Sequence, residues 1–307
     1  MSRSLDPIIR RHLQPMEPLP TAVAPRLRPL TGVRAVLFDI YGTLLISASG
    51  DVTTGQGVAK GPALAAALAA VGLPLEGDPD GGVQVLEDQI AADHRRGQAA
   101  GIPFPEVDIR QIWRGTLAHL RQNGLLPEPA GPGAAGAVQG EVLPESRLQQ
   151  LACEYEMRVN PVWPMPQARA CLQQLHAAGL LLGLISNAQF LTRELWRLLL
   201  EAEAGGFSID QQLQYYSYQH GRAKPDVELY LLAVEDLARR DIRAGEVLYV
   251  GNDMLNDIQP ASRVGFRTAL FAGDARSLRC REGDPRVAGV VPDLVIMSLA
   301  DLPACVG

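Results

Sequence analysis

The sequence predicts an α/β fold, a Rossmann-like parallel sheet core with an inserted α-helical domain. Two observations carry this prediction. Short apolar runs that end on polar residues, VRAVLFD at 33–39 and LLGLISN at 181–187, are typical of buried parallel strands. The stretch between them, 53–159, shows helical periodicity and no convincing strand, so we expect it to form a separate helical domain.

The composition is that of a soluble globular protein. With 307 residues, 47% of them apolar, the chain is long enough for two unequal domains. Its net charge of -6 argues against nucleic acid or an anionic membrane as a partner, and no apolar run approaches a membrane span. The 4 cysteines are scattered without a CxxC pair, which predicts reduced thiols in the cytoplasm rather than a zinc site. These features do not predict the oligomeric state.

The chain divides into an extension, a core and an insert. Residues 1–32 are rich in proline and arginine, which predicts an N-terminal extension over the surface with one short helix at 4–13. The core is expected at 33–52 and 160–307, and the helical insert at 53–159. Helices of the insert are expected at 58–71, 83–99, 106–123 and 144–158. The remaining core strands are expected at 181–185, 214–218, 247–250, 267–272 and 293–297.

A carboxylate ends the first strand. Asp39 follows the apolar run directly, and Gly42 and Thr43 then turn the chain away. Ligands of open α/β sheets bind beyond the carboxyl ends of the strands, where an aspartate serves as nucleophile or metal ligand. The alternative is an ordinary strand-ending aspartate that caps a turn.

Three later stretches place further polar residues at strand ends or in adjoining loops. Ser186 and Asn187 end the second strand, and Lys224 lies in the turn GRAKPD. The strand VLYV is followed by the acidic run GNDMLND, which contains Asp253 and Asp257. A lysine before proline at a helix start is unfavourable beside the positive end of the helix dipole, which favours a functional role. For Asp257 the alternative is a helix N-cap.

In this order, the four motifs resemble those of the haloacid dehalogenase-like hydrolase superfamily, over 33–270 apart from the insert. The resemblance implies that the insert is a cap over the active site and that Asp39 is the nucleophile. It also implies that Lys224 orients the nucleophile and balances the nearby carboxylates. The residues expected to contact the transferring group are Ser186, Asn187 and Thr43.

The resemblance further implies a magnesium ion, which would neutralise a phosphate dianion under attack. It would be held by Asp39, the backbone carbonyl of Tyr41 and the acidic cluster. Within the cluster we favour Asp253 as the direct ligand, with Asp257 either as a further ligand or as a residue that contacts the ligands. Asn252 occupies the place where many relatives carry the aspartate, so the assignment is open by one residue.

Tyr41 is the main departure from the phosphatases of this superfamily, which carry a second aspartate two residues after the nucleophile. A phenol is a poor base at neutral pH, although it can donate a hydrogen bond to a leaving oxygen. Tyrosine here looks like the haloacid dehalogenases. Against that, the dehalogenases use no metal and their fourth motif is rich in serine and asparagine, whereas the run 251–257 is acidic and suits a metal. The favoured function is a Mg²⁺-dependent phosphatase of a small metabolite acting through an aspartyl-phosphate. The alternatives are a 2-haloacid dehalogenase using Asp39, and a binding or scaffold protein on a decayed hydrolase core.

Overall fold

The computed structural model describes residues 5–49, 59–127, 142–201 and 207–306. The chain forms two compact units, residues 1–13 with 55–161 and residues 14–54 with 162–307. The expected N-terminal extension is therefore divided between the units at residue 13. The expected start of the insert, between 52 and 53, lies outside the described residues.

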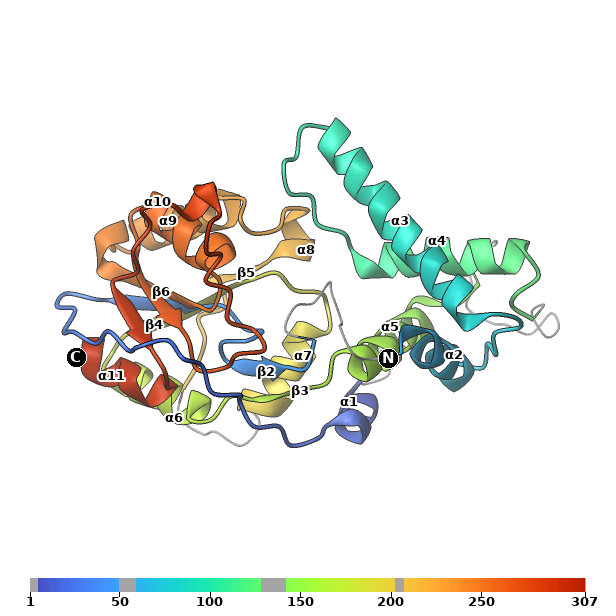
Figure 1. Cartoon of the computed structure of the whole chain (residues 1–307), viewed down its shortest axis with the longest axis horizontal. Coiled ribbons are helices and arrows are strands. Elements are labelled where there is room, and N and C mark those ends of the chain that lie inside the picture. The colour runs from blue at the N-terminus through green and yellow to red at the C-terminus, as the bar shows by residue number, and fades with distance from the viewer. Residues whose placement is uncertain (1–4, 50–58, 128–141, 202–206, 307) are drawn as a thin grey trace. The chain divides into compact units, whose positions relative to one another are not determined.

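A six-stranded parallel sheet forms the centre of the second unit, which confirms the α/β prediction (Figure 1). Its strands, in spatial order, are β5 (Gln214–Tyr216), β4 (Leu181–Ser186), β1 (Ala35–Phe38), β6 (Val247–Gly251), β7 (Arg267–Phe271) and β8 (Leu294–Ile296). In the centre, Phe38 of β1 is aligned with Leu184 of β4 and Val250 of β6. The carboxyl ends of these three strands therefore lie at the same edge of the sheet.

Helices cover both faces of this sheet (Figure 1). On one face, α9 (Glu228–Ala238) and α10 (Gln259–Arg263) pack in a core cluster with Leu37 and Tyr249. On the other face lie α6 (Ala168–Ala177) and α11 (Leu302–Val306). The shorter elements are α7 (Thr192–Trp196), α8 (Ser217–His220), π-helical turns at Arg197–Glu201 and Met254–Ile258, and 3₁₀ turns at Ala244–Glu246, Pro285–Val287 and Leu299–Asp301.

A short antiparallel ribbon, β2 (Leu45–Ser47) with β3 (Val162–Pro164), is the part of the second unit that the sequence did not predict. Ile46 pairs with Trp163 in this ribbon. The chain therefore leaves the sheet unit and re-enters it on two adjacent strands.

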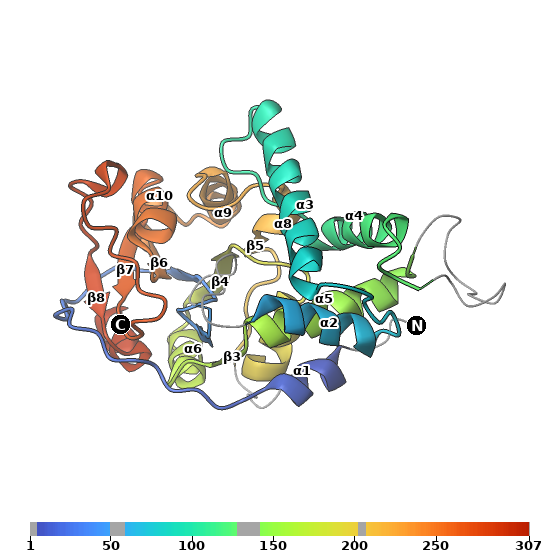
Figure 2. The ribbon, with the colours of Figure 1, turned by 45° about the vertical axis from the view of Figure 1, so that its right-hand side comes forward.

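The first unit is helical, with α2 (Lys60–Ala70), α3 (Pro79–Ala99), α4 (Ile109–Gln122) and α5 (Glu145–Val159) (Figure 2). Each lies within a few residues of an expected helix. The short α1 (Asp6–His12) packs against α5. Glu154 of α5, 2% exposed, accepts hydrogen bonds from Arg11 at 2.9 Å and pairs with His12 at 3.0 Å and with Arg158. These contacts attach α1 to the helical unit.

The proline-rich segment 14–32 is fixed to the sheet unit by backbone contacts. The Leu19 N–H donates to the Asp274 carboxylate at 3.0 Å, and Arg26 pairs with Val295 at the edge of β8. The Leu30 N–H donates to the carbonyl of Cys305 at 2.7 Å. Among the described residues, no helix is both long enough and apolar enough to cross a membrane.

Candidate active site

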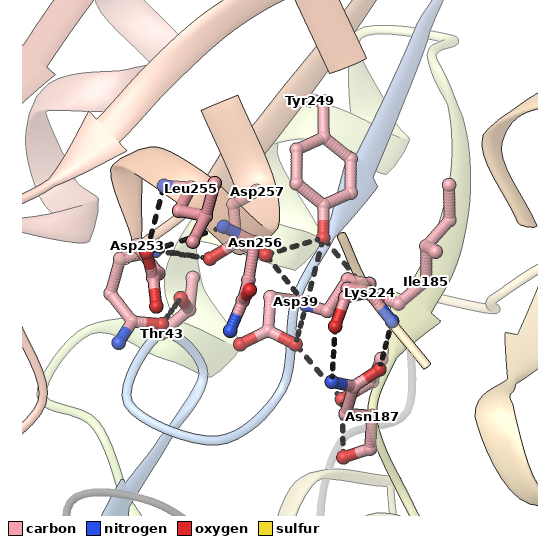
Figure 3. Close-up of polar contacts among 12 residues, drawn as sticks. Asp39, Thr43, Ile185, Asn187, Lys224, Tyr249, Asp253, Leu255, Asn256 and Asp257 are labelled. Carbon is pink, nitrogen blue, oxygen red and sulfur yellow. Dashed lines mark hydrogen bonds and ion pairs between the residues drawn. The ribbon is translucent and has the colours of Figure 1, made fainter. Parts of the chain in front are cut away.

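Polar side chains from several segments meet at the carboxyl edge of the sheet, within the second unit (Figure 3). They line a pocket formed by Asp39, Tyr41, Asn187, Lys224, Asn252, Asp253, Asn256, Asp257, Ser277 and Arg279. Two further residues singled out from the sequence, Thr43 and Ser186, are fully buried and contact residues that line the pocket. The parallel sheet thus brings all the candidate residues together. They lie at the carboxyl ends of the strands, where open α/β sheets bind their ligands.

Asp39 is fixed through one of its two oxygens. Its backbone N–H donates to the carbonyl of Val250 at 2.9 Å, which holds the residue in line with the sheet. The Ser186 hydroxyl and the Lys224 ammonium both donate to Asp39 Oδ1, at 2.9 and 2.7 Å. Among the described residues no donor contacts Oδ2, and Figure 3 shows this oxygen without a partner. A carboxylate that is oriented through one oxygen and open at the other is arranged to act as a nucleophile.

Lys224 is buried between two carboxylates. Its ammonium lies 2.7 Å from Asp39 Oδ1 and 2.5 Å from Asp257 Oδ1. Burial alone would lower the pKa of Lys224, but the charges of Asp257 and Asp39 outweigh it and raise the pKa well above its usual range. The ammonium therefore stays charged. The Asn187 amide holds the Lys224 backbone, accepting from its N–H at 2.7 Å and donating to its carbonyl at 3.3 Å.

The argument from the helix dipole does not apply to Lys224. The helix expected from Pro225 begins only at Glu228, and the Asp226 carboxylate accepts a hydrogen bond from the Glu228 N–H. Lys224 therefore precedes the helix in a turn. Its burial between two acids, rather than its place in the sequence, distinguishes it from an ordinary surface lysine.

Asp257 has both oxygens engaged. Oδ2 accepts hydrogen bonds from the backbone N–H groups of Asn252 and Asp253, at 3.0 and 2.9 Å. Oδ1 accepts a hydrogen bond from the Lys224 ammonium and lies 3.1 Å from the Tyr249 hydroxyl. Burial raises the pKa of Asp257 above its usual range, and Lys224 opposes that shift. The carboxylate holds the acidic loop against the lysine, and it is not the N-cap of the helical turn, which is Asp253.

Asp253 is also fully engaged. Its Oδ1 accepts from the N–H groups of Leu255 and Asn256, at 2.8 and 3.2 Å, and caps the turn that precedes α10. The guanidinium of Arg281 forms a two-point ion pair with the same carboxylate, with Nε 3.1 Å from Oδ1 and Nη2 2.5 Å from Oδ2. Four donors therefore surround the residue that the sequence favoured as a direct metal ligand.

Asn252 takes part in a smaller network behind the pocket. Its side-chain oxygen accepts from the Thr43 hydroxyl at 3.1 Å, and its amide donates to the carbonyl of Ser277 at 2.6 Å. Gly42 lies against this pair with φ +83, and a Cβ there would come within 2.5 Å of Ser277 Cβ. The glycine is therefore required both for the turn and for the close approach of the Ser277 loop.

The donor set does not fit a magnesium ion held by the expected ligands. Mg²⁺ takes oxygen ligands in an octahedral arrangement, commonly one or two carboxylates with water. Asp253 and Asp257 have their oxygens occupied, and the adjacent position is the amide Asn252. Within the described ranges no group of three or more His, Cys, Asp or Glu side chains is arranged to hold a metal ion. Of the expected set, this leaves Asp39 and the carbonyl of Tyr41.

The remaining candidates contact protein groups rather than leaving their donors open. The Tyr41 side chain lines the pocket with its hydroxyl 2.8 Å from Thr192 Oγ1. The polar groups of Ser186, Asn187 and Thr43, which the sequence assigned to the substrate, meet Asp39, the Lys224 backbone and Asn252. Their binding of the transferring group stays a prediction, and the observed contacts orient the nucleophile and its lysine.

Four residues near the site were not found by reasoning from the sequence: Tyr249, Ser277, Arg279 and Arg281. Tyr249 carried a signal, because it is the one residue with a polar side chain in the apolar strand VLYV. The other three lie in a loop beyond the last motif, where nothing in the local sequence points to the pocket. Burial and the charge of Asp257 raise the pKa of Tyr249, so its hydroxyl remains a donor.

Comparisons with known proteins identify the family of the chain. The family model for haloacid dehalogenase-like hydrolases matches residues 33–265. A glyceraldehyde 3-phosphate phosphatase of Methanocaldococcus jannaschii is 30% identical over 132 residues, 43% of this chain and 54% of that protein. A ribulose-1,5-bisphosphate 5-phosphatase of Halopiger xanaduensis is 30% identical over 138 residues, 45% of this chain and 54% of that protein. The chain thus spans about half the length of these relatives.

A similar fold is found among solved structures. The 2-haloacid dehalogenase from Pseudomonas syringae pv. Tomato DC3000 superposes with a TM-score of 0.53 at 19% identity, covering 89% of this chain and 97% of that chain. At this identity the likeness concerns the fold alone. The family match extends over most of the chain and includes all four motifs. The chain belongs to the haloacid dehalogenase-like hydrolase family.

Proposed function

We propose that the protein hydrolyses phosphomonoesters of small molecules, with Asp39 as the covalent nucleophile. The observation that carries this proposal is the Asp39 carboxylate, held through Oδ1 by Ser186 and Lys224 with Oδ2 left open. Such a group can attack phosphorus to form an acyl phosphate that water then cleaves. Since the protein belongs to a hydrolase family, the scaffold alternative is not carried further.

The choice of phosphate esters is supported by the curated relatives. Three of them, at 30 to 33% identity over parts of their length, are phosphatases by name, and two of those names contain a sugar phosphate or sugar bisphosphate. The pocket agrees with an anionic substrate, because Lys224 and Arg279 both line it. The sequence alone does not identify the substrate.

The proposed reaction proceeds in two steps at Asp39. Oδ2 attacks phosphorus, the bond from phosphorus to the ester oxygen breaks, and the alkoxide leaves and takes up a proton from Tyr41 or from water, so that it is released as the alcohol. Water then attacks the phosphorus of the aspartyl-phosphate, which releases inorganic phosphate and restores the carboxylate. Lys224 and Ser186 keep Oδ1 in place throughout, so the attacking oxygen needs no reorientation. No step of this scheme passes through a metal ion.

The leaving group determines the importance of Tyr41. An alkoxide must take up a proton as it departs. Tyr41 is one of the residues that line the pocket, and its hydroxyl would exchange the contact with Thr192 Oγ1, at 2.8 Å, for one with the leaving oxygen. The phenol is a weaker acid than the aspartate found in related phosphatases. The proposal therefore includes a preference for esters whose alcohol is itself a good leaving group.

The same Tyr41, together with Asn252, favours a second candidate, metal-free dehalogenation of a 2-haloacid. There Asp39 Oδ2 would displace halide from carbon, and water would then hydrolyse the carboxylic ester formed. Halide departs as an anion and needs no acid. The absence of an aspartate at residue 41, and of one at residue 252, is compatible with this chemistry.

A substrate panel distinguishes the two candidates. Phosphorylated sugars, aryl phosphates and 2-haloacids are incubated with the purified protein, with Mg²⁺ or with a chelator, and released phosphate and halide are measured. The matched control is Asp39→Asn, which replaces the carboxylate at nearly the same volume. We expect phosphate release that Asp39→Asn loses while its thermal melting stays close to that of the wild type.

Each outcome of the panel bears on the assignment. Halide release without phosphate release would replace phosphatase by dehalogenase at the same aspartate. Turnover that persists in a folded Asp39→Asn variant would remove covalent catalysis by this residue. Release of neither product from any member of the panel would speak against both activities.

The cytoplasmic location expected from the sequence is part of this proposal. Cys171, Cys280 and Cys305 are free thiols, and Cys171 and Cys305 are buried, which is consistent with a reducing compartment. Phosphorylated metabolites are substrates of the same compartment.

A further inference from the structure

We infer that the guanidinium of Arg281 supplies the positive charge opposite the acidic cluster, and that the native site holds no tightly bound divalent cation. The inference deepens the proposed function, because it concerns the charge available to an anionic substrate at Asp39. Its main test is a binding measurement, which can succeed or fail whether or not the protein is a phosphatase.

The first support is the coordination of Asp253. Its carboxylate accepts two hydrogen bonds from Arg281 and two from the backbone N–H groups of Leu255 and Asn256. The carboxylate is 8% exposed and the Arg281 side chain 33% exposed. A two-point pair between a guanidinium and a carboxylate is among the strongest polar contacts in proteins. A metal ion at Oδ2 would have to displace the Arg281 guanidinium, and one at Oδ1 would also have to displace the cap of the helical turn.

The second support is that the neighbouring acids offer no substitute. Asp257 is 1% exposed and receives Lys224 and two backbone N–H groups. The position beside Gly251 is Asn252, a neutral amide already bonded to Thr43 and Ser277. The acidic run therefore contributes two carboxylates to the site and neither has an open oxygen. The negative charges of both carboxylates are compensated by hydrogen bonds and ion pairs within the protein.

The third support is the way the fold delivers Arg281. The loop after β7 pairs with the acidic run: the Arg279 N–H donates to the carbonyl of Asn252 at 3.0 Å, and the Met254 N–H donates to the carbonyl of Arg279 at 2.9 Å. Arg281 follows two residues later with φ 54, a left-handed conformation that residues other than glycine rarely adopt. Backbone pairing and this conformation together hold the guanidinium at Asp253.

The fourth support is the balance of charge around the pocket. Three carboxylates and three cations meet there, namely Asp39, Asp253 and Asp257 with Lys224, Arg279 and Arg281. A site built for a divalent ion carries an excess of negative charge, as Mg²⁺ sites do. Here the excess is absent, and two further positive charges would be poorly compensated.

The experiment titrates MgCl₂ into the full-length protein by calorimetry, for the wild type, Arg281→Gln and Arg281→Gly. Glycine tolerates the left-handed conformation, so the second variant guards against misfolding caused by the first. We expect weak binding by the wild type and at least about tenfold tighter binding by both variants, because Asp253 gains an open oxygen. The matched control is Arg279→Gln, a guanidinium of the same loop that donates to the carbonyls of Arg276 and Leu278.

The control removes one positive charge but opens no carboxylate oxygen, so it should bind Mg²⁺ more weakly than either Arg281 variant. Adding Asp253→Asn to Arg281→Gln should abolish the gain. Wild-type binding as tight as that of folded Arg281 variants would overturn the inference, as would a gain that survives Asp253→Asn. Phosphate release from p-nitrophenyl phosphate, measured with and without chelator, is the second readout, and we expect the two rates to agree within about twofold. Loss of phosphate release in the presence of chelator also overturns the inference. If no phosphate is released under either condition, the proposed function is rejected, and the Mg²⁺ titration alone decides the inference about Arg281.

Discussion

Replacing Lys224 with methionine tests the centre of the site, because one buried ammonium there serves two buried carboxylates. The side chains of Lys224, Asp39 and Asp257 are 4%, 8% and 2% exposed, and both contacts are 2.7 Å or shorter. Methionine keeps the unbranched shape of the chain and removes the charge. The two carboxylates are then left together without a cation.

The expected loss can be worked out from these contacts. Removing one partner of a buried ion pair costs about 3–5 kcal/mol of unfolding free energy. Coulomb's law gives a similar figure, since two unit charges 4 Å apart interact by about 4 kcal/mol at an effective dielectric constant of 20. We therefore expect Lys224→Met to lower the free energy of unfolding by about 3–5 kcal/mol at neutral pH.

This loss should depend on pH in a defined direction. In the wild type the raised pKa of Lys224 means that its stabilisation is fully present below the unfolded value of about 10.4. In the variant, Asp257 loses the cation that opposes the effect of its burial, so its pKa should lie further above the unfolded value of about 3.9, and the variant gains stability as the pH falls and a proton is bound. The difference between the two proteins should therefore be smaller at pH about 4.5 than at about 7.5.

Urea denaturation at both pH values measures this difference, with Lys224→Met/Asp257→Asn as the control that removes one of the two competing carboxylates. We expect the double variant to recover part of the loss. A Lys224→Met protein within about 0.5 kcal/mol of the wild type at neutral pH would refute the reasoning, since surface substitutions have effects of that size. So would a loss that is the same at both pH values.

Two further predictions follow from single side chains. Tyr41→Asp should raise the turnover of alkyl phosphates about tenfold or more and change that of aryl phosphates little, because only an alkoxide needs a proton. Steady-state kinetics on both kinds of ester, with melting curves as the check on folding, measure this. Equal or lower turnover of alkyl phosphates by a folded variant would favour dehalogenation. Glu156 of α5 has its pKa raised to about 7 by burial, partly offset by Asn160, so the folded protein should lose stability as the pH rises from 4.5 through about 7 and Glu156→Gln should remove this loss. Glu154 is the matched control, because burial raises its pKa but Arg158, His12 and Arg11 outweigh burial and lower it. Glu154→Gln should therefore destabilise the protein above pH 4.5. Melting temperatures measured at pH about 5 and 8 test both predictions, and equal shifts for the two variants would contradict them.

The sheet could be predicted because buried parallel strands leave a strong signal. Runs such as VRAVLF and LLGLIS are apolar on both faces, and β1 and β4 lie inside them. The β2–β3 ribbon could not be predicted in the same way. Each strand has three residues and forms only because a distant segment supplies its partner, as in the pair of Ile46 with Trp163, which are 117 positions apart.

The sequence predicts which residues form the site better than it predicts the hydrogen bonds and ion pairs among them. Motif order placed Asp39, Lys224 and Asp257 in one family pattern, and the parallel register brings them within hydrogen-bond distance. A sequence does not say which oxygen meets which donor. The partner of Asp253 is 28 residues further on, in a loop whose course depends on backbone pairing with Asn252 and Met254. This is why an acidic run suggested a metal and the structure shows an ion pair.

The number of acids in a motif is therefore a poor guide to the chemistry of this pocket, and the number of open oxygens is a better one. Asp253 and Asp257 each accept four hydrogen bonds or ion-pair contacts, so their charges stabilise the loop and the lysine rather than a ligand. Among the described residues, Asp39 is the carboxylate of the three that keeps an oxygen open. Loss of either of the first two should appear mainly in the free energy of unfolding, because a buried partner is left unpaired. Loss of Asp39 should appear mainly in turnover, because the open oxygen is the one group of the three that can form a bond to a substrate.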